Sequence, residues 1–259
     1  MLGVREDRIA VPASLARWVA SISELRSAST HGQTVVRLPD ATSSLVIYED
    51  ARGAVRVVAV GPVKRAFYKS TASLGRYTRI SFHPGKARLA LGISPRELAD
   101  QSTDLLALWG HSARPLFDAV ARGTLERVMT VLAHRFEDAT SIASDIVQRA
   151  ASALEAADAE SVRAIAGRLH VSERFLRNAF RDELGISPKR HARIARIRRV
   201  AEAAATGALP WAAVATTYGF FDQAHMNAEF RDLLRTTPTA FRAGEVPASS
   251  GCGVSQLRP

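Results

Sequence analysis

Short β-branched and aromatic runs dominate the early part of the chain, and a helical period dominates the rest. Between residues 34 and 82 these runs are separated by Pro and Gly turns, which is typical of strands joined by tight connections. The strands that we expect are Thr34–Leu38, Ser44–Tyr48, Val55–Val60 and Tyr77–Phe82. Short strands at this spacing predict a small barrel or sandwich.

Helical spacing flanks this β-rich region on both sides. Before it, an amphipathic helix is predicted around Leu15, Trp18, Val19 and Ile22. After it, a helical segment is expected from Lys86 to Leu91. A further helix start is predicted at Ser94-Pro95, because serine can cap a helix and proline fits its first turn.

From residue 115 to about residue 156, an apolar stripe repeats with the helical period. The stripe consists of Leu116, Val120, Leu125, Val128, Leu132 and Phe136, followed by Ile142, Ile146 and Val147. Either a homodimer seam or ordinary packing inside the monomer would bury it. The alanine-rich, acidic stretch from residue 150 to residue 160 then predicts a helical connector between domains.

A phrase that occurs twice, fifty positions apart, marks the C-terminal part. Phe180-Arg181-Asp182 returns as Phe230-Arg231-Asp232. Before each copy, a short helical run meets a break and then a good N-cap, Ser172 in the first copy and Asp222 in the second. A helix, a tight turn and a helix, repeated at a fixed period, predict two helix-turn-helix units.

The helix after Ser172 has two opposite faces. At 100° per residue its apolar residues gather on one face, which would pack into the domain. The other face carries Arg174, Arg177, Asn178 and Arg181. Arg can donate two hydrogen bonds to guanine O6 and N7, and Asn can pair likewise with adenine. A merely solvated charge cluster is the alternative, but the cap, the turn and the duplication favour contact with DNA.

The second copy offers fewer hydrogen-bonding groups. Its candidates for DNA contact are Gln223, Asn227 and Arg231. Ala224 and Ala228 occupy positions that carry Arg and Asn in the first copy. Alanine cannot hydrogen-bond to a base edge, although it can touch a thymine methyl group. A purely structural second copy therefore remains an alternative.

A long helix is predicted between the two copies. Ser187 can cap it, Pro188 can open it, and Gly207 ends it shortly after residue 205. Eighteen residues at ~1.5 Å rise span about 27 Å, against roughly 34 Å between successive major-groove faces. Such a helix could hold both units against one side of a duplex. Phosphate contacts are predicted near its start, from Lys189, Arg190 and Arg193.

Positive charge is concentrated around the first copy. The chain has a formal net charge of +10, and residues 163–199 contain eleven Lys or Arg against three Asp or Glu. Residues 200–259 contain four basic and five acidic residues. Because phosphate contacts dominate non-specific affinity for nucleic acid, the first copy is expected to supply most of it.

Several classes of protein are disfavoured. The single cysteine, Cys252, cannot form an internal disulfide and fits a reducing cytosol. No apolar run approaches the ~18 residues of a membrane span, so no membrane is expected. The four N-terminal histidines, His31, His83, His111 and His134, lie at no metal-ligand spacing. Phosphate-loop, nucleophile-elbow and dinucleotide motifs are missing, so neither metal nor cofactor is expected. A DNA-directed repair or modification enzyme remains an alternative, although Cys252 lies in a Gly/Ser-rich tail and is a poor nucleophile.

Four local motifs in the C-terminal part carry a resemblance to a known family. They are Gly185-Ile186-Ser187-Pro188, Tyr218-Gly219-Phe220, Asp222-Gln223-Ala224-His225 and Phe241-Arg242. Through them, residues 161–242 resemble the DNA-binding domain of AraC/XylS-type transcription regulators. The resemblance implies a seven-helix, all-α domain. It also implies base contacts from Arg174, Arg177, Asn178, Gln223 and Asn227. The sequence departs from the family pattern at His170, where the first turn usually has Gly, and at Ala228, which replaces a frequent Arg.

The N-terminal part resembles, more loosely, an uncharacterised β-rich domain attached to some of these regulators. The matching phrases are Phe82-His83-Pro84-Gly85 and Leu108-Trp109-Gly110. In the wider family, N-terminal domains often bind an effector or mediate dimerisation. The resemblance names no ligand.

Together these patterns predict an α+β chain. We expect a β-rich effector or dimerisation domain over residues 1–114, a helical linker over 115–158, the DNA-binding domain over 159–245 and a disordered tail over 246–259. The expected function is sequence-specific regulation of transcription, as an activator, in the cytoplasm and on the nucleoid. Double-stranded DNA is the expected partner, and the resemblance adds RNA polymerase. A small-molecule effector and a homodimer stay open.

Overall fold

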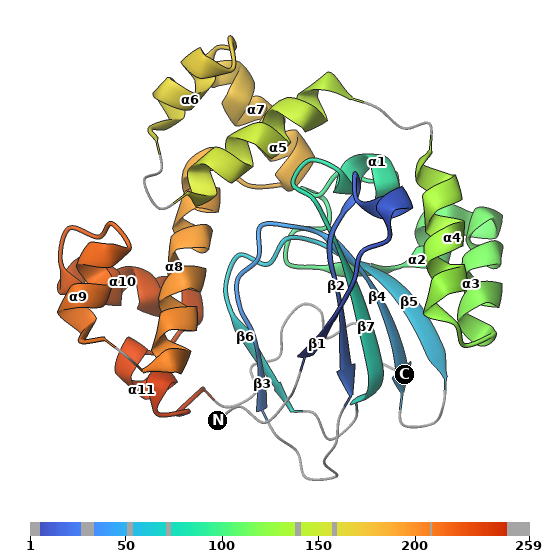
Figure 1. Ribbon diagram of the computed structural model, residues 1–259, viewed down its shortest axis with the longest axis horizontal. Coiled ribbons are helices and arrows are strands. Elements are labelled where there is room, and N and C mark those ends of the chain that lie inside the picture. Colours follow the sequence, from blue (N-terminus) through green and yellow to red (C-terminus); the bar gives the residue numbers. More distant parts are fainter. Residues whose placement is uncertain are drawn as a thin grey trace.

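The chain folds into a β-rich half and a helical half that lie side by side (Figure 1). The computed structural model describes residues 6–26, 34–50, 54–70, 74–137, 141–156, 160–207 and 209–247. The predicted α+β class, with a β-rich N-terminal domain and a helical C-terminal domain, is confirmed. The expected barrel is not closed: among the described strands, the two edges of the main sheet do not pair with each other.

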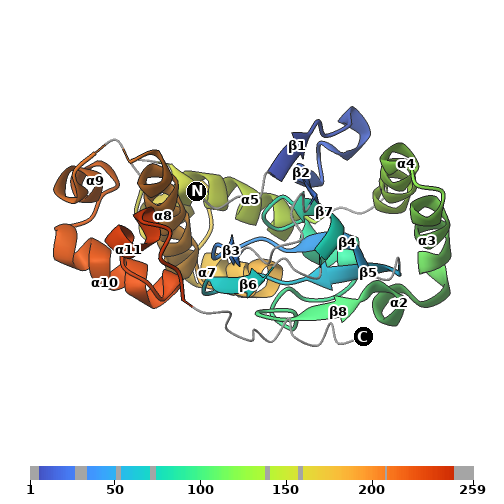
Figure 2. The same cartoon turned by 90° about the horizontal axis from the view of Figure 1, so that it is seen from below.

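The main sheet is antiparallel throughout, in the strand order β1-β2-β7-β4-β5-β8. Its strands are β1 (Glu6–Ile9), β2 (Val19–Arg26), β4 (Ser44–Asp50), β5 (Val55–Val60), β7 (Leu74–Phe82) and β8 (Ser102–Asp104). A separate antiparallel pair is formed by β3 (Thr34–Arg37) and β6 (Phe67–Ser70). In both views this pair lies between the main sheet and the helical half (Figures 1 and 2).

Helices cover one face of the main sheet. They are α1 (Ala87–Leu91), α2 (Leu105–Trp109), α3 (Arg114–Ala121) and α4 (Leu125–Phe136). Leu45, Ile80 and Phe82 from the sheet share one buried cluster with Leu132 and Phe136 from α4. The part of the apolar stripe that lies on α3 and α4 is therefore used mainly inside the monomer.

Two local predictions in this half are wrong. Residues 15–22, expected as an amphipathic helix, contain the end of a 3-10 turn (Ala13–Leu15) and the start of β2. Their apolar side chains have helical spacing, but β2 pairs with both β1 and β7, and this tertiary pairing overrides the local pattern. The helix expected from Ser94 is a series of turns. The Ser94 hydroxyl instead donates to the carbonyl oxygen of Asp182, 3.2 Å away.

Among the described residues of the C-terminal half, seven helices are present. They are α5 (Ile142–Glu155), α6 (Val162–Arg168), α7 (Glu173–Leu184), α8 (Pro188–Thr206), α9 (Trp211–Thr217), α10 (Gln223–Leu234) and α11 (Pro238–Arg242). As predicted, Ser187 caps α8 by accepting from the amide of Arg190, and Gly207 ends it in a left-handed conformation.

The segment 115–158, expected as a helical linker, packs on two different cores. Helices α3 and α4 bury their apolar faces against the sheet. Helix α5 packs against α7 and α8, and its residues Val147, Ala151 and Leu154 are part of the helical core. The described ranges also contain two 3-10 turns, at Ala13–Leu15 and Gly110–Ala113. Among the described residues, no helix combines the length and the apolar character that a bilayer crossing requires.

Candidate nucleic-acid interface

The first helix-turn-helix unit consists of α6, a tight turn and α7. The amide of Val171 donates to the carbonyl of Ala166 at 3.0 Å, which closes the turn. His170 occupies the left-handed region with φ 55°, a conformation that is uncommon outside glycine. Ser172 caps α7, since its hydroxyl accepts from the amide of Phe175 at 3.1 Å. The predicted turn and cap are thus both present.

The second unit, α9 and α10, repeats this turn with one additional residue. The amide of Phe220 donates to the carbonyl of Ala215 at 2.9 Å, and Gly219 takes the left-handed conformation with φ 71°. The carboxylate of Asp222 caps α10 by accepting from the amide of His225 at 2.7 Å. In the first unit the cap follows the turn-closing residue directly, whereas Phe221 separates Phe220 from Asp222 in the second.

Helix α7 turns its predicted DNA-contacting face to solvent. Leu176 and Phe180 are fully buried beneath the helix. The opposite face, as predicted, is exposed: Arg174, Arg177, Asn178 and Arg181. Arg177 forms an ion pair with Glu173 one turn earlier, with 2.5 Å between its Nη2 and Glu173 Oε2. This pair holds one guanidinium group along the outer face of the helix.

Helix α10 presents a less polar outer face. Gln223 and Arg231 are exposed, and Asn227 is half-buried. Met226 and Phe230 anchor the inner face, both at 0 % exposure. All three predicted contacts thus lie on the outer side of the helix, where the two alanines of the same face are also exposed.

Helix α8 places the three predicted phosphate contacts differently. Lys189 is exposed, but Arg190 and Arg193 are half-buried and donate hydrogen bonds to other parts of the protein. Arg190 Nη2 donates to the carbonyl of Lys64 in the β-rich half at 2.9 Å, and burial lowers the pKa of its guanidinium. Arg193 donates to Glu229 at 2.9 Å and to Asp232 at 3.0 Å, both on α10. In this arrangement only Lys189 is free to meet a phosphate from solvent.

The β-rich half contacts the C-terminal end of α10. Arg65 pairs with Asp232 at 2.8 Å, and the amide of Ala66 donates to the carbonyl of Leu233 at 2.7 Å. The buried hydroxyl of Tyr68 donates to the carbonyl of Leu234. Burial raises the pKa of Tyr68 to about 12, so the phenol stays protonated as a donor at neutral pH.

A second contact reaches the C-terminal end of α7. Arg88 Nη1 lies 3.5 Å from the buried carboxylate of Glu183, whose pKa is raised by burial. The backbone of Gly185 approaches the loop before β8 so closely that a Cβ there would lie 2.7 Å from the carbonyl oxygen of Pro95. These long-range contacts had no local signal in the sequence. They place the β-rich half against the ends of both recognition helices.

A polar cavity of about 410 Å³ separates the outer face of the main sheet from α5 and α8. Ser21, Ser81 and Arg79 line it from the sheet, and His191 and Arg198 line it from α8. His191 is 1 % exposed, and its Nε2 lies 2.9 Å from the carboxylate of Glu155. The ring of His191 also packs edge-on against Phe180 of α7, with 5.8 Å between ring centroids.

The buried carboxylate of Asp40 ties the sheet to α8 at one wall of this cavity. It pairs with Arg79, and at 3.5 Å with Arg198 of α8. Burial alone would raise the pKa of Asp40, but Arg79, Arg198 and Arg37 outweigh it and hold the pKa far below its usual range. The surrounding guanidinium groups therefore favour the charged form of this carboxylate.

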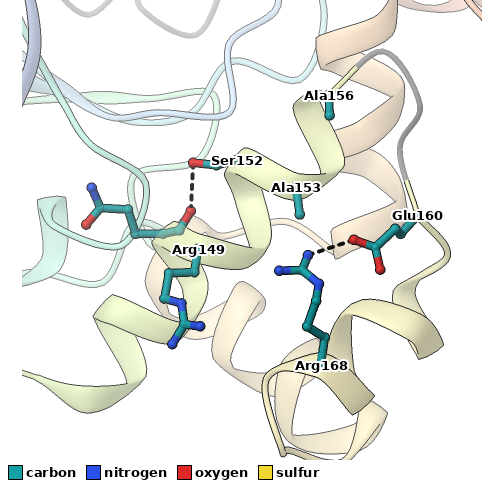
Figure 3. A pocket seen from close by; sticks show the side chains of 7 residues that line it. Arg149, Ser152, Ala153, Ala156, Glu160 and Arg168 are labelled. Atoms are coloured by element: carbon teal, nitrogen blue, oxygen red, sulfur yellow. Dashed lines mark hydrogen bonds and ion pairs between the residues drawn. The ribbon is translucent and has the colours of Figure 1, made fainter.

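An open groove of about 630 Å³ lies beside the first unit, between α5 and α6 (Figure 3). Arg149, Ser152 and Ala153 line it from α5. On the opposite wall, Arg168 Nη2 donates to Glu160 at 2.8 Å. Because Arg168 and Glu160 are paired with each other on this wall, we assign the groove no ligand.

A family comparison agrees with this geometry. Residues 165–244 match the family model described as "Helix-turn-helix domain". Over this segment the chain is similar to helix-turn-helix domains. The match spans both turns and both recognition helices, so the two predicted units in the C-terminal part are confirmed. A search of curated proteins finds no match to the chain.

Several solved structures resemble parts of the chain. The C-terminal domain of AraT, a response regulator from Geobacillus stearothermophilus, is 24% identical, with 43% of this chain and 94% of that chain covered and a TM-score of 0.38. An AraC-type regulator from Chromobacterium violaceum is 24% identical, with 39% and 92% covered and a TM-score of 0.37. ToxT from Vibrio cholerae O395 is 10% identical, with 85% and 100% covered and a TM-score of 0.43. At these TM-scores no functional conclusion follows.

Proposed function

We propose that this chain is a sequence-specific regulator of transcription that binds double-stranded DNA with two recognition helices. The observation that carries the proposal is the outer face of α7, where Arg174, Arg177 and Asn178 are exposed on a capped helix that is anchored from below. Helix α8, with 19 residues, separates the two units by about 28 Å along its axis. That distance suits adjacent turns of one face of a duplex.

The proposed roles follow from the chemistry of each side chain. Arg174, Arg177 and Asn178 would contact base edges, because guanidinium and amide groups match guanine and adenine in the major groove. Arg181 and Lys189 would contact phosphates, which position the protein without specifying sequence. On α10, Gln223, Asn227 and Arg231 would provide the corresponding contacts. For Arg190, which donates to Lys64, and Arg193, which donates to Glu229, we propose a role in holding the protein together in place of the expected phosphate contacts.

The N-terminal half is proposed to control the DNA-binding half. It touches α7 through Arg88 and α10 through Arg65, in each case near the C-terminal end of the helix. Any change in this docking would alter the relative placement of the recognition helices. The polar cavity beside α8 is the proposed effector site, since its size falls within the range of small-molecule pockets.

The remaining roles rest on the family resemblance. We propose that the protein acts as an activator, contacts RNA polymerase and works in the cytoplasm on the nucleoid. A homodimer also belongs to this proposal. Of the apolar stripe that could form its seam, Ile142 is 81 % exposed, whereas Leu116, Leu132 and Phe136 are buried within the chain.

The test of the proposal is a genome-wide footprint followed by binding to the footprinted duplex. Arg177→Ala should weaken binding about 5- to 150-fold and relax preference at one base pair, as expected for a lost bidentate contact. The matched control is Arg127→Ala, which removes the same charge from an exposed site on α4. Equal losses in the two variants, or no specific footprint with the wild-type protein, would contradict the proposal.

A further inference from the structure

An acidic residue, Glu173, lies at the start of α7 beside the arginines of its outer face. The side chain of Glu173 is 34 % exposed, and its Oε2 lies 2.5 Å from Nη2 of Arg177. The other two arginines have no acidic residue one turn earlier in the chain, because His170 precedes Arg174 at that distance and Arg177 precedes Arg181. The ion pair therefore orders one of the three arginines on this face.

A purely stabilising role accounts for Glu173 only in part. An acidic residue in the first turn complements the helix dipole, and an ion pair between positions i and i+4 adds some helix stability. Both effects are small at exposed sites, and α7 already has a cap in Ser172 and a buried anchor in Leu176 and Phe180. On a helix that enters a groove, a carboxylate also repels the nearby phosphates. Glu173 therefore costs affinity for DNA, which points to a role other than affinity.

The direction of the pair turns Arg177 toward the leading end of α7. Side chains on a helix lean toward its N-terminus, and Glu173 lies one turn N-terminal to Arg177. The N-terminal residues of a recognition helix are those that reach base edges. A guanidinium group has five N–H donors. Since Glu173 Oε2 engages Nη2 alone, the group keeps enough donors for a two-bond contact with guanine.

We propose that Glu173 is a positioning residue that orients Arg177 for a guanine contact in the first major-groove segment. The inference rests on the proposed function, because it needs α7 to enter a groove. An arginine side chain loses rotamer entropy when it binds. The ion pair removes part of this freedom before DNA arrives, so Glu173 increases base preference although its charge weakens attraction to phosphates. In the second unit the equivalent positions carry Gln223 and Asn227, which cannot form an ion pair.

A guanine analogue with carbon in place of N7 tests the contact directly, because it keeps the pairing face of guanine and lacks one of the two acceptors. The full chain is titrated with the footprinted duplex, in which each guanine of the first segment is replaced in turn. The position at which replacement weakens binding of the wild-type protein but not of Arg177→Ala is the Arg177 contact. Discrimination is the ratio of the two affinities at this position.

Glu173→Ala should reduce the discrimination about two- to tenfold, because Arg177 must then be ordered during binding. Its affinity for a random-sequence duplex should rise at the same time, since a negative charge near the phosphates is removed. The matched control is Glu126→Ala, which removes the same charge from the first turn of α4 and should leave the discrimination unchanged. Thermal unfolding of the exposed Glu173 variants should differ little from that of the wild type.

Two conservative variants separate the orientation of Arg177 from charge alone. Glu173→Asp keeps the charge but places the carboxylate one methylene nearer the backbone, so Arg177 can follow it only by withdrawing from the groove. This variant should lose discrimination as Glu173→Ala does. Glu173→Gln keeps the length of the side chain and can accept one hydrogen bond from Arg177, so it should retain part of the discrimination.

The opposite order, with discrimination kept in Glu173→Asp and lost in Glu173→Gln, would overturn the inference, because charge would then be the cause. Unchanged discrimination in Glu173→Ala would overturn it as well. So would a further loss of base preference when Glu173→Ala is added to Arg177→Ala, since Glu173 would then act without Arg177.

A failure of the proposed function has a different signature, namely that the wild-type protein gives no specific footprint. A specific footprint in which Arg177→Ala matches the wild type at every guanine overturns the inference alone. The two failures are therefore distinguishable.

Discussion

Single residues in this chain carry conformations and charges that only their surroundings explain. His170 holds a left-handed turn in which the second unit uses Gly219. Asp40 is charged and buried among guanidinium groups from two halves of the molecule. The departure at His170 is visible in the sequence, since the second copy has Gly at the equivalent place. The ion cluster at Asp40 is not visible there, because its partners lie up to 158 residues away.

His170→Gly should stabilise the protein. A non-glycine residue in the left-handed region costs about 1–3 kcal/mol, part of which glycine gives back through unfolded-state entropy, so we expect a net gain of about 1 kcal/mol in the free energy of unfolding. His170→Val should destabilise by about 2 kcal/mol, because a branched Cβ is least tolerated there. Urea denaturation of the three proteins checks the order, and a more stable valine variant would refute the strain.

Asp40 should make the protein sensitive to acid. Its folded pKa lies far below the unfolded value of about 3.9, so the carboxylate contributes stability that is fully present above about pH 5 and is lost progressively as the pH falls. Asp40→Asn should destabilise by about 3–5 kcal/mol at pH 7, since it leaves buried guanidinium groups uncompensated. The difference in melting temperature between the two proteins should shrink from pH 7 to pH 3. A constant difference would show that the ion cluster is not the cause.

At the level of elements, the sequence predicts those helices and strands whose ends and faces are determined by neighbouring residues. The caps Ser172, Ser187 and Asp222, the long helix α8 and four strands follow from composition and spacing, and the structure contains them. Strand β2 was missed because its apolar spacing imitates a helix and only its pairing with β1 and β7 reveals it. The exposure of Arg174, Arg177 and Asn178 on one face of α7 was predictable from helical angle, and their contact with DNA stays a prediction. The engagement of Arg190 and Arg193 was not predictable, since their partners are remote in sequence or on another element.

Strand β6 should loosen from α10 when Tyr68 loses its hydroxyl. Tyr68→Phe leaves the carbonyl of Leu234 buried without this donor, which costs about 1–3 kcal/mol. The amide of Ala66, which donates to Leu233, reports the docking directly. Hydrogen exchange at Ala66 should accelerate in the variant, whereas exchange at Ile22 in the main sheet should not change. Equal acceleration at both sites would indicate global destabilisation instead.

At the scale of the whole molecule, the β-rich half contacts both recognition helices, α7 and α10. The β-rich half contacts α7 near Glu183 and α10 near Asp232, while α8 and then α9 lie between the same two helices along the chain. Two independent ties therefore fix the distance and angle between the units. The outer faces of the first halves of both helices remain outside these contacts, and Arg174, Arg177 and Gln223 on them are exposed. The contacts at the C-terminal ends of α7 and α10 hold the spacing of the two units. The faces of these helices that are proposed to contact a duplex stay exposed.

The stiffness predicts a narrow tolerance for the spacing of the two DNA segments. One base pair inserted between the two DNA segments shifts the second segment by about 3.4 Å along the duplex axis and rotates it about that axis. The wild-type protein should therefore lose most of its specific affinity. The double variant Tyr68→Phe with Arg88→Ala removes one contact from each recognition helix and should lose less on the same insertion. Binding assays with duplexes of zero, one and two inserted base pairs measure this. Identical spacing profiles would show that α8 alone sets the distance.

Ala66 and Tyr68 of the β-rich half are buried in the same cluster as Leu233 and Leu234. The helical half is thus not a freely exchangeable module. A chimera that joined the helical half to a foreign sensor domain would expose Leu233 and Leu234. It would also leave the carbonyl groups of these two residues without their donors, Ala66 and Tyr68. A fusion protein that contains the helical half would fold correctly only if it also contained the short segment around Ala66 and Tyr68.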